Sequence, residues 1–591
     1  MRNRLWIIIL LMVWIGQWAF DVPEKWPQPR VFKRAVWHSA ENLAELVDYQ
    51  ARRQMLWSSV RSYACRQRQR RRQPSYRRVR GQKVEDEEQK AQSQERWKDK
   101  SEAVFEAQRW GLSPELSREL AEHLQQFCQR YYECFKSKTR NMGKYAYHYL
   151  SGLLRLEAPR NYTNIGRATG EAGENIQHFM SNSPWLARMS LEQVQEEIKA
   201  TPGLQRGGML LLDESADEAA GDKKAGAGRQ YNGRLGKVDM SRVGVFLAYA
   251  NLSDAKRPVW TWVDGELYLQ EHWFSSKMAE ERQRVGIPSE RAFQTKIELG
   301  YQMIQRVKAK GLPFEAVACD DLYGQSPWLR DRLDEEELVY MADVPCTTQV
   351  YLEKPVLGVP KPVPGRRGPK PTRIRVLNDS KPFKIHQVAR RADTIWKHIR
   401  VRPIERGELN DPFAARRVWT LREGETEPVE EWLVIRHEAK KRYNYALSNA
   451  SANASLEHLA WLKCQRYFVE RANQDAKSGA GWDELQAQKY RGWEHHLALV
   501  ILVSWFVAQI KWEWGHKYIR DPALAQQFAV DVLPALSMAN IRLLLRAAMP
   551  LPQPTPEQAV ALVVEQLVNR TRSRSSRLKC QRATHNAHAP P

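Results

Sequence analysis

Cysteine is scarce in this chain of 591 residues, and its number and spacing argue against a disulfide-stabilised domain and against a zinc-stabilised one. The cysteines are Cys65, Cys128, Cys134, Cys319, Cys346, Cys464 and Cys580. Their number is odd and no two of them form a CxxC pair, so the sequence predicts neither a disulfide framework nor a zinc ribbon. We therefore expect a protein of a reducing compartment.

Acidic residues are also in short supply, because 69 Asp and Glu stand against 92 Lys and Arg and leave a formal net charge of +23. An excess of this size favours a polyanionic partner, and nucleic acid is the first candidate in a chain of this length. The 22 tryptophans either build cores or offer flat rings to nucleic-acid bases. A hydrophobic content of 42% with a mean hydropathy of −0.63 excludes a polytopic membrane protein and a wholly disordered chain.

Hydrophobic runs are few and short. The run from Leu5 to Phe20 follows two arginines and has the look of a signal peptide or an anchor. It is shorter than the ~20 residues that span a bilayer, and no small-x-small cleavage site follows it. A start site placed too far upstream and a buried helix are the alternatives, and we expect no membrane role. The run HLALVILVSWFVAQI at 496–510 predicts a buried core helix for the same reason of length.

Buried-strand patterns begin near residue 208 and follow a definite order. Short apolar runs at 209–213, 242–250, 259–269, 314–320 and 338–344 predict five strands. Helical patterns precede and follow the fourth strand. The order strand, strand, strand, helix, strand, helix, strand predicts an α/β fold of the ribonuclease-H-like kind, a mixed sheet with flanking helices.

Three acids stand out by their places in this order. Asp213 ends the first strand, Asp320 ends the fourth, and Glu470 lies in a late helix. Neighbouring strand ends bring such acids together, and converging carboxylates require cations, for which Mg²⁺ or Mn²⁺ is suited. Two such ions about 4 Å apart support in-line phosphoryl transfer. Each acid alone also has a structural explanation as a cap, a turn residue or a surface charge, and nearby competitors are Asp217, Asp222 and Asp321.

The late helix carries a polar face. Arg466, Glu470, Asn473 and Lys477 recur at helical spacing and fall on one side. Such a face would place a metal ligand between groups that hold phosphates. A solvated charged face gives the same spacing, and spacing alone does not choose between the two.

Several segments together resemble a known family. They are LLLDESADEAAG (210–221), GAGRQYNGRLGKVDMSRVGVFLAYA (226–250), ELYLQEHW (266–273), FQTKIELG (293–300), VACDDLYG (317–324) and RYFVERANQDAKSGAGWDELQAQKYRGWEHH (466–496). In this order they resemble the DDE transposases of bacterial insertion sequences that have a strand-rich insertion between the second Asp and the Glu, the IS-four and IS-seven-zero-one clan. The resemblance spans roughly residues 105 to 515.

The resemblance implies a function and a set of site residues. Asp213, Asp320 and Glu470 would be the catalytic and metal-binding triad, with two Mg²⁺ or Mn²⁺ ions. The activity implied is cleavage of DNA at the ends of an insertion sequence and strand transfer to target DNA. The implied partners are the terminal inverted repeats and the target DNA, bound by a dimer, in the nucleoid-associated cytoplasm.

The resemblance also implies DNA contacts and shows departures. Arg466, Glu470 and Lys477 satisfy the clan pattern, whereas Lys463 stands where a Tyr is usual, and we expect Lys463 to contact phosphate instead. Glu214 and Ser215 follow the first Asp, where members of the group often have Thr and paired Lys. In relatives with the insertion a Trp holds a flipped base. The candidates here are Trp396, Trp419 and Trp432, although for any one of them a role as a core or cross-strand residue is the better explanation.

Composition and motifs together divide the chain into six segments. These are a hydrophobic, Arg-rich and disordered N-terminal part (1–100), a helical DNA-binding region (101–205), the first part of the catalytic core (206–345), a β-rich insertion (346–445), the second part of the core (446–520) and a helical region with a basic disordered tail (521–591). The Arg block at 66–80 favours a nucleic-acid-binding arm over a solvated linker. The stretch 160–185, broken near Gly170 and Gly173, has the pattern of a helix-turn-helix, which any two packed helices share.

Two other classes remain beside the transposase. One is a catalytically inactive or domesticated relative that only binds DNA, and the other is a structure-specific nuclease of the same fold. The presence of all three acids favours the enzyme over the inactive relative. A nuclease that never joins strands would not need the long insertion or the Arg and Lys beside Glu470.

Overall fold

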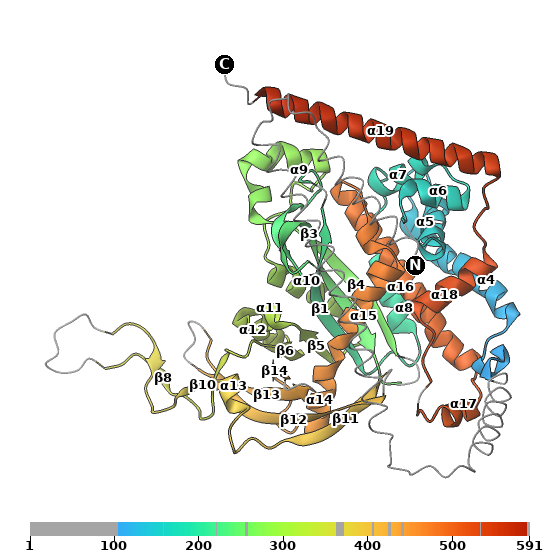
Figure 1. The fold of residues 1–591 in the computed structure, drawn as a ribbon. Helices are drawn as coiled ribbons and strands as arrows, with labels where there is room; N and C mark the ends of the chain where they lie inside the picture. Colours follow the sequence, from blue (N-terminus) through green and yellow to red (C-terminus); the bar gives the residue numbers. More distant parts are fainter. Residues whose placement is uncertain are drawn as a thin grey trace, which may run out of the picture. The chain divides into compact units, whose positions relative to one another are not determined.

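The computed structural model describes residues 104–587, apart from residues 158, 220, 234, 255–257, 362–370, 405–406, 423–426, 439–441 and 532 (Figure 1). The hydrophobic run from Leu5 to Phe20 and the Arg block at 66–80 lie outside the described residues. The expectations for these two segments therefore stay predictions.

The central sheet has the strand order predicted for a ribonuclease-H-like fold. Its core strands are β1 (Gly208–Glu218), β3 (Lys237–Asn251), β4 (Val259–Tyr268), β5 (Ala316–Cys319) and β6 (Val339–Asp343). They lie side by side in the order β4, β3, β1, β5, β6, with β4, β3 and β1 antiparallel to one another and β1, β5 and β6 parallel. The short strand β2 (Gly228–Asn232) pairs with the beginning of β3. The predicted fold class is confirmed.

Burial explains why the parallel strands read as unbroken apolar runs. Every residue of β5, with the sequence AVAC, is buried, as parallel strands covered on both faces require. Successive side chains of β1 point to opposite faces of the sheet. Leu212 points towards Gly300 of α10 (Lys296–Ala309), whereas Asp213 points towards α15 (Tyr467–Gln474). The first acid therefore leaves the sheet on the side of the late helix.

The predicted β-rich insertion continues the core sheet. Its strands are β7 (Gln349–Tyr351), β8 (Leu357–Gly358), β9 (Arg375–Val376), β10 (Pro382–Lys384), β11 (Lys397–Ile404), β12 (Gly407–Thr420), β13 (Val429–Glu438) and β14 (Arg442–Ser448). Strand β14 pairs antiparallel with β6, so core and insertion share one sheet of 12 strands in the described part of the chain. Only β8 and β9 form a separate pair there.

A buried charge network joins the insertion to the core. Glu431 of β13 is fully buried and accepts hydrogen bonds from Arg330 Nε at 3.1 Å and Tyr340 Oη at 2.5 Å. Thr420 and Arg422, both from the insertion, also contact this carboxylate. Burial alone would raise the pKa of Glu431, but the two arginines hold it below its ordinary value. Glu431 therefore stays ionised where the two parts of the sheet meet.

Helices surround the sheet and precede it. They are α4 (Pro114–Arg130), α5 (Gly143–Arg155), α6 (Tyr162–Thr169), α7 (Gly173–Ser181), α8 (Ala187–Ala200), α9 (Ala279–Val285), α11 (Asp321–Gly324), α12 (Pro327–Glu335), α13 (Ile385–Val388), α14 (Leu456–Gln465), α16 (Tyr490–Lys517), α17 (Pro522–Gln527), α18 (Met538–Ala548) and α19 (Pro556–Ala587). The predicted break between two short helices lies at Gly170, whose φ of 71° ends α6. The DNA-binding role of this pair stays a prediction.

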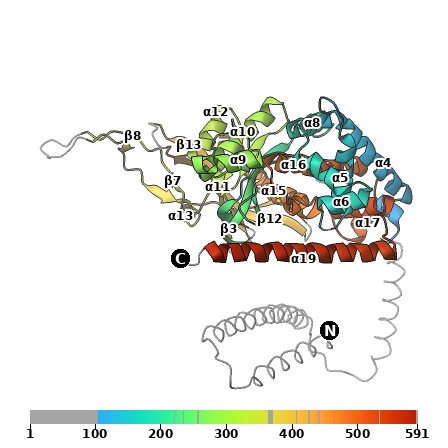
Figure 2. The same cartoon turned by 90° about the horizontal axis from the view of Figure 1, so that it is seen from above.

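Helix α16 is the core helix that the apolar run at 496–510 predicts. It contacts β4 and the helices α5, α7 and α8, and Figures 1 and 2 both show it between the sheet and α5. In the described residues it is the one helix with the length and hydropathy to cross a membrane, and 78% of its most apolar window is buried inside the protein. This burial confirms the prediction of a core helix.

The C-terminal region differs from its prediction. The sequence predicts a basic disordered tail after about residue 570, but α19 runs without a break from Pro556 to Ala587. The segment after Pro556 contains no Gly and no further Pro before residue 589, and it is rich in Arg, Ala, Gln and Leu, which favour helix. An ion pair of 2.7 Å joins Glu565 of α19 to Arg167 of α6.

Candidate active site

Three parallel strands of the core each lead to an aspartate at the same edge of the sheet. Asp213 follows Leu212, which pairs with Cys319, and Asp320 is the next residue after that cysteine. Asp343 is the last residue of β6, directly after the partner of Cys319 in that strand. The carboxyl ends of parallel strands form the usual ligand-binding edge of α/β sheets. Asp343 was not among the residues predicted from the sequence, although its place at the end of the fifth strand was a usable signal.

The first two aspartates form a strained electrostatic pair. Burial, together with the negative charge of Asp320, raises the pKa of Asp213 to about 7. Burial raises the pKa of Asp320 to about 6, against the opposing effect of a backbone N–H of α11. Asp320 is also the N-cap of that helix and accepts from the backbone N–H of Leu322 at 3.1 Å. Asp320 therefore starts a turn, as one interpretation of the sequence predicts, and it also lies beside Asp213. A nearby positive charge would favour the ionised form of both carboxyl groups.

Glu470 reaches this edge through an arginine. Its side chain is 59% exposed on α15, and it accepts a hydrogen bond of 3.5 Å from Arg466 Nη2. The same guanidinium donates from Nε to Asp343 at 3.0 Å. Burial alone would lower the pKa of Arg466, but four carboxylates around it raise the value. These are Asp343, Asp213, Glu470 and Asp320. The positive charge that these four carboxylates share is therefore the guanidinium of Arg466.

The described residues contain no group of three or more His, Cys, Asp or Glu side chains that could hold a metal ion together. Asp213 and Asp320 lie close enough for the charge of Asp320 to act on Asp213, whereas Glu470 is linked to the same edge through Arg466. The physical reason is that Arg466 already neutralises the edge and holds Glu470 on its own helix face. The convergence of all three acids on a metal stays a prediction. The two aspartates still fit a divalent cation, because they are adjacent hard oxygen donors whose ionisation is opposed by burial and mutual repulsion.

A side-chain amide fixes the first aspartate. Asn473 of α15 donates from Nδ2 to Asp213 Oδ2 at 3.0 Å, and its Oδ1 accepts from Trp262 Nε1 at 2.9 Å. Trp262 is buried and stacks on Phe246, with ring centroids 4.0 Å apart. Since both ends of the amide are engaged, its orientation is set by the indole. The helical spacing placed Asn473 on the face of Glu470, but the partner Trp262 lies 211 positions away and left no local signal.

The predicted lysines lie in different surroundings. Lys463 is 4% exposed and donates to Asp343 Oδ1 at 2.7 Å, so it anchors α14 to the end of β6. Lys477 lies in the π-helical turn Asp475–Gly479, where the spacing of an ordinary α-helix no longer holds. Its charge acts on Asp217 of β1. The expectation that Lys477 shares the face of Glu470 and the phosphate contacts of both lysines stay predictions.

The tryptophans of the insertion have partners within the protein. The ring of Trp396 is half-buried and packs beside His437 and Tyr443 at centroid distances of 6.0 and 5.9 Å. Lys354 lies over the ring of Trp419, and Trp432 donates from Nε1 to the carbonyl oxygen of Ser451 at 3.0 Å. These contacts match the structural explanation, and a base contact by Trp396 stays a prediction.

Comparison with known proteins agrees with this geometry. Residues 130–408 match the family model described as the DDE superfamily endonuclease, a span that contains Asp213 and Asp320 and ends before Glu470. The middle part of the chain is therefore similar to the DDE superfamily endonucleases. It is also similar to a protein of Microchaete diplosiphon named as a probable transposase for insertion sequence element IS701, with 24% identity over 220 residues. That alignment covers 36% of this chain and 51% of the relative, or about half the relative's length. The family resemblance inferred from the sequence is confirmed.

Proposed function

We propose that this DDE protein is a transposase that cleaves DNA at the ends of an insertion sequence and transfers the freed strands to target DNA. The observation that carries the proposal is the pair Asp213 and Asp320, which directly follow Leu212 and Cys319, the last parallel pair between β1 and β5. Asp213 does not end its strand as predicted, because β1 continues to Glu218 through its pairing with β3. The family match and the name of the relative support the same reaction class. The terminal inverted repeats, a dimer on DNA and a nucleoid-associated location in the cytoplasm belong to this proposal.

Asp213 and Asp320 would hold the divalent cation, Mg²⁺ or Mn²⁺, and Glu470 would complete the set for two ions. When bound, such ions activate a water or 3′-hydroxyl nucleophile and stabilise the leaving oxygen of a phosphoryl transfer. Glu470 is free to reach this position at low cost. Its contact with Arg466 four residues earlier is 3.5 Å long, and exposed pairs of this kind contribute about 0.3–0.5 kcal/mol.

The remaining residues of the edge position the ligands. The amide of Asn473 holds one oxygen of Asp213 and, through Trp262, ties that carboxylate to the core. Asp343 holds Arg466 and Lys463 and so fixes the junction of α14 and α15 against the sheet. The helix that carries Glu470 therefore starts from a rigid point beside the two strand ends.

A second candidate function is that of an inactive relative that binds DNA without cleaving it. The lack of a closed three-ligand group in the described residues and the presence of Arg466 among the carboxylates favour this alternative. The two candidates differ in one property, the dependence of strand cleavage on Asp213.

The test compares Asp213→Asn with the wild-type protein on DNA that carries the inverted repeats flanking the gene. Gel shift measures binding, and single-turnover reactions with Mg²⁺ measure cleavage. We expect Asp213→Asn to lose cleavage and keep binding, whereas the control Asp222→Asn, an exposed acid in the same segment, should keep both. Wild-type protein that binds the repeats but does not cleave them would favour the inactive relative. Equal cleavage by Asp213→Asn and the wild-type protein would disprove the assignment of the site.

A further inference from the structure

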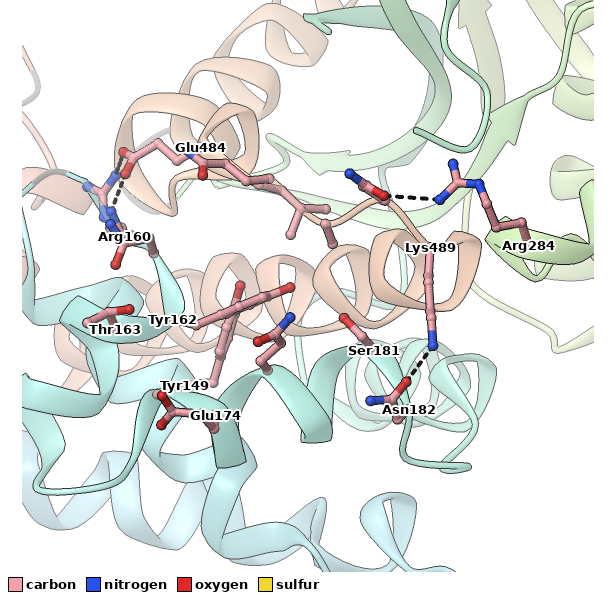
Figure 3. A pocket seen from close by; sticks show the side chains of 17 residues that line it. Tyr149, Arg160, Tyr162, Thr163, Glu174, Ser181, Asn182, Arg284, Glu484 and Lys489 are labelled. Atoms are coloured by element: carbon pink, nitrogen blue, oxygen red, sulfur yellow. Dashed lines mark hydrogen bonds and ion pairs between the residues drawn. The ribbon is translucent and has the colours of Figure 1, made fainter. Parts of the chain in front are cut away.

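A polar cavity of about 700 Å³ lies between the helices before the core and the segment that leads into α16 (Figure 3). One wall comes from the end of α5 and from α6 and α7, including Tyr149, Tyr162 and Gln177. The opposite wall is the segment from Glu484 to Lys489, with Arg284 beside it. Its size is in the range of ligand-binding pockets. Polar side chains predominate in its lining, so the ligand it fits is a hydrated and polar one.

The cavity lies on the continuation of the strand that carries the first catalytic aspartate. Asp217 stands four residues after Asp213 on β1, which is about 14 Å along an extended strand. Its register partner Arg242 is buried and donates to the carbonyl oxygens of Leu485 and Ala487 at 3.4 and 3.3 Å. These two carbonyls belong to the cavity wall. The wall is thus tied to β1 beyond the acidic edge.

Lysines and an arginine form the rim on this side. Lys489 is exposed and donates to Asn182 Oδ1 at 2.5 Å, and Arg284 donates to Gln488 Oε1 at 3.2 Å (Figure 3). The backbone N–H of Ala225 donates to the carbonyl oxygen of Gln488 at 2.8 Å, which places the neighbouring Lys224 beside the same segment. Lys224 and Lys477 both act on the charge of Asp217. Positive side chains therefore line the path between the acidic edge and the cavity.

The negative charges of the lining do not cancel this rim. Glu484 is engaged by Arg160 through both its backbone N–H and its guanidinium, and Glu174 is exposed at the start of α7. The hydroxyl of Tyr162 is buried in the wall beside the side chain of Ser181. Burial raises the pKa of Tyr162 to about 12, so the hydroxyl remains a donor at neutral pH. At the rim, Arg284 is also paired with Glu281, which accepts from its Nε at 2.8 Å, whereas Lys489 is bound by the neutral amide of Asn182. Both rim side chains carry donors, which suit an anionic oxygen.

We propose that the rim of Lys489 and Arg284, with the cavity behind it, binds backbone phosphates of the DNA strand that runs on from the catalytic edge. This inference rests on the proposed function, since it takes the DNA to be held at Asp213 and Asp320. DNA rises about 3.4 Å per base pair, and Asp217, whose partner Arg242 holds the cavity wall, lies about 14 Å from Asp213 along β1. On this spacing the rim meets the duplex about four base pairs from the scissile phosphate. The phosphates there contribute affinity and register without sequence readout.

The test uses the double variant Lys489→Gln/Arg284→Gln in the full chain, with Lys310→Gln as the control. Lys310 is a surface lysine paired with Glu192 away from the cavity. Fluorescence anisotropy measures binding of end-repeat duplexes over a range of salt. Loss of two phosphate contacts should reduce the slope of log K against log salt by about 1.8, at about 0.9 per contact, and the control should keep the wild-type slope.

A series of duplexes trimmed from either side of the cleavage position locates the contact. Wild-type and double-variant proteins should bind alike when the duplex ends within about four base pairs of the scissile phosphate on one side, and should differ once it is longer. An unchanged slope in the double variant, or a difference that does not depend on duplex length, would overturn the inference. Tight binding of inorganic phosphate or a free mononucleotide with no effect on duplex would overturn it as well.

Failure of this inference and failure of the proposed function have different signatures. If Asp213→Asn loses cleavage while the double variant keeps the wild-type slope, the function stands and the cavity is not a DNA site. If the wild-type protein neither binds nor cleaves end DNA, the proposed function fails first. Both rim residues are exposed, so their substitution leaves the core intact, and Tyr162→Phe gives an independent check by removing the hydroxyl of the cavity wall alone.

Discussion

Replacing the first aspartate with its uncharged isostere should make the metal-free protein more stable at alkaline pH. Asp213 lies beside Asp320 in a buried edge, and its pKa is raised from 3.8 to about 7. Because the pKa in the folded chain exceeds that in the unfolded chain, the folded chain binds more protons between about pH 4 and about pH 7. The free energy of unfolding therefore falls as pH rises through this window. Asp213→Asn removes the ionisation and with it this loss.

The magnitude follows from the same shift. A change of one pKa unit corresponds to about 1.4 kcal/mol, so the rise from 3.8 to about 7 sets an upper limit of about 4 kcal/mol. Arg466 and the amide of Asn473 already relieve part of the charge, which places the observed gain below that limit. Such a gain in stability is common when a residue that serves function at the expense of stability is replaced.

The assay is urea unfolding of the wild-type, Asp213→Asn and Asp222→Asn proteins in the presence of a chelator. At about pH 8 the Asp213→Asn midpoint should be higher than that of the wild-type protein, and at about pH 4.5 the two should nearly coincide. Asp222→Asn should match the wild-type protein at both values, since its side chain is exposed. Addition of Mn²⁺ should stabilise the wild-type protein and not Asp213→Asn, which reduces or reverses the difference at pH 8. The reasoning fails if Asp213→Asn is destabilised at pH 8 or gains equally at both pH values.

Two further predictions concern residues that hold the site and the sheet. Asn473→Ala removes a hydrogen bond to a charged group, which contributes about 1.5–3 kcal/mol, so single-turnover cleavage should fall roughly 10- to 150-fold and half-saturation should need more Mn²⁺. Its exposed neighbour supplies the control, Gln474→Ala, and equal rates for the two would show that the amide does not position Asp213. Glu431→Ala leaves Arg330 buried without its carboxylate and should lower the free energy of unfolding by about 3–5 kcal/mol. Urea unfolding measures this, with the exposed Glu427→Ala as the control; a loss below about 1 kcal/mol would contradict it.

The strand order and two of the acids were predictable because they depend on local burial. A short apolar run such as MLLLD or AVACD reports a strand that is covered on both faces, and the first polar residue after it marks the edge of the sheet. Asp213 and Asp320 were found in this way. Asp343 obeys the same rule at the end of β6, but the family pattern contains only three acids and does not include it.

Partners across long sequence separations were not predictable. The helical spacing selected Arg466 and Asn473, but it carried no information about Asp343 or Trp262 as their partners. Spacing also assumed a regular α-helix, whereas a π turn begins at Asp475 and contains Lys477, whose charge acts on Asp217. A π turn results from tertiary packing and leaves no mark in the hydrophobic period.

The arrangement of charge at the edge explains why this chain can fold before it meets a metal. The charges of two buried aspartates side by side would oppose folding. Arg466 reduces this cost, because the acids share its guanidinium and Asp343 holds that guanidinium in place. Asp343 in turn pairs with Lys463, and burial opposes the ionisation of Asp213 and Asp320, the two acids proposed to bind the metal. A cation that binds there need not displace a strong ion pair. For Glu470 to join the site, only its weak contact with Arg466 has to break, because Glu470 is otherwise exposed.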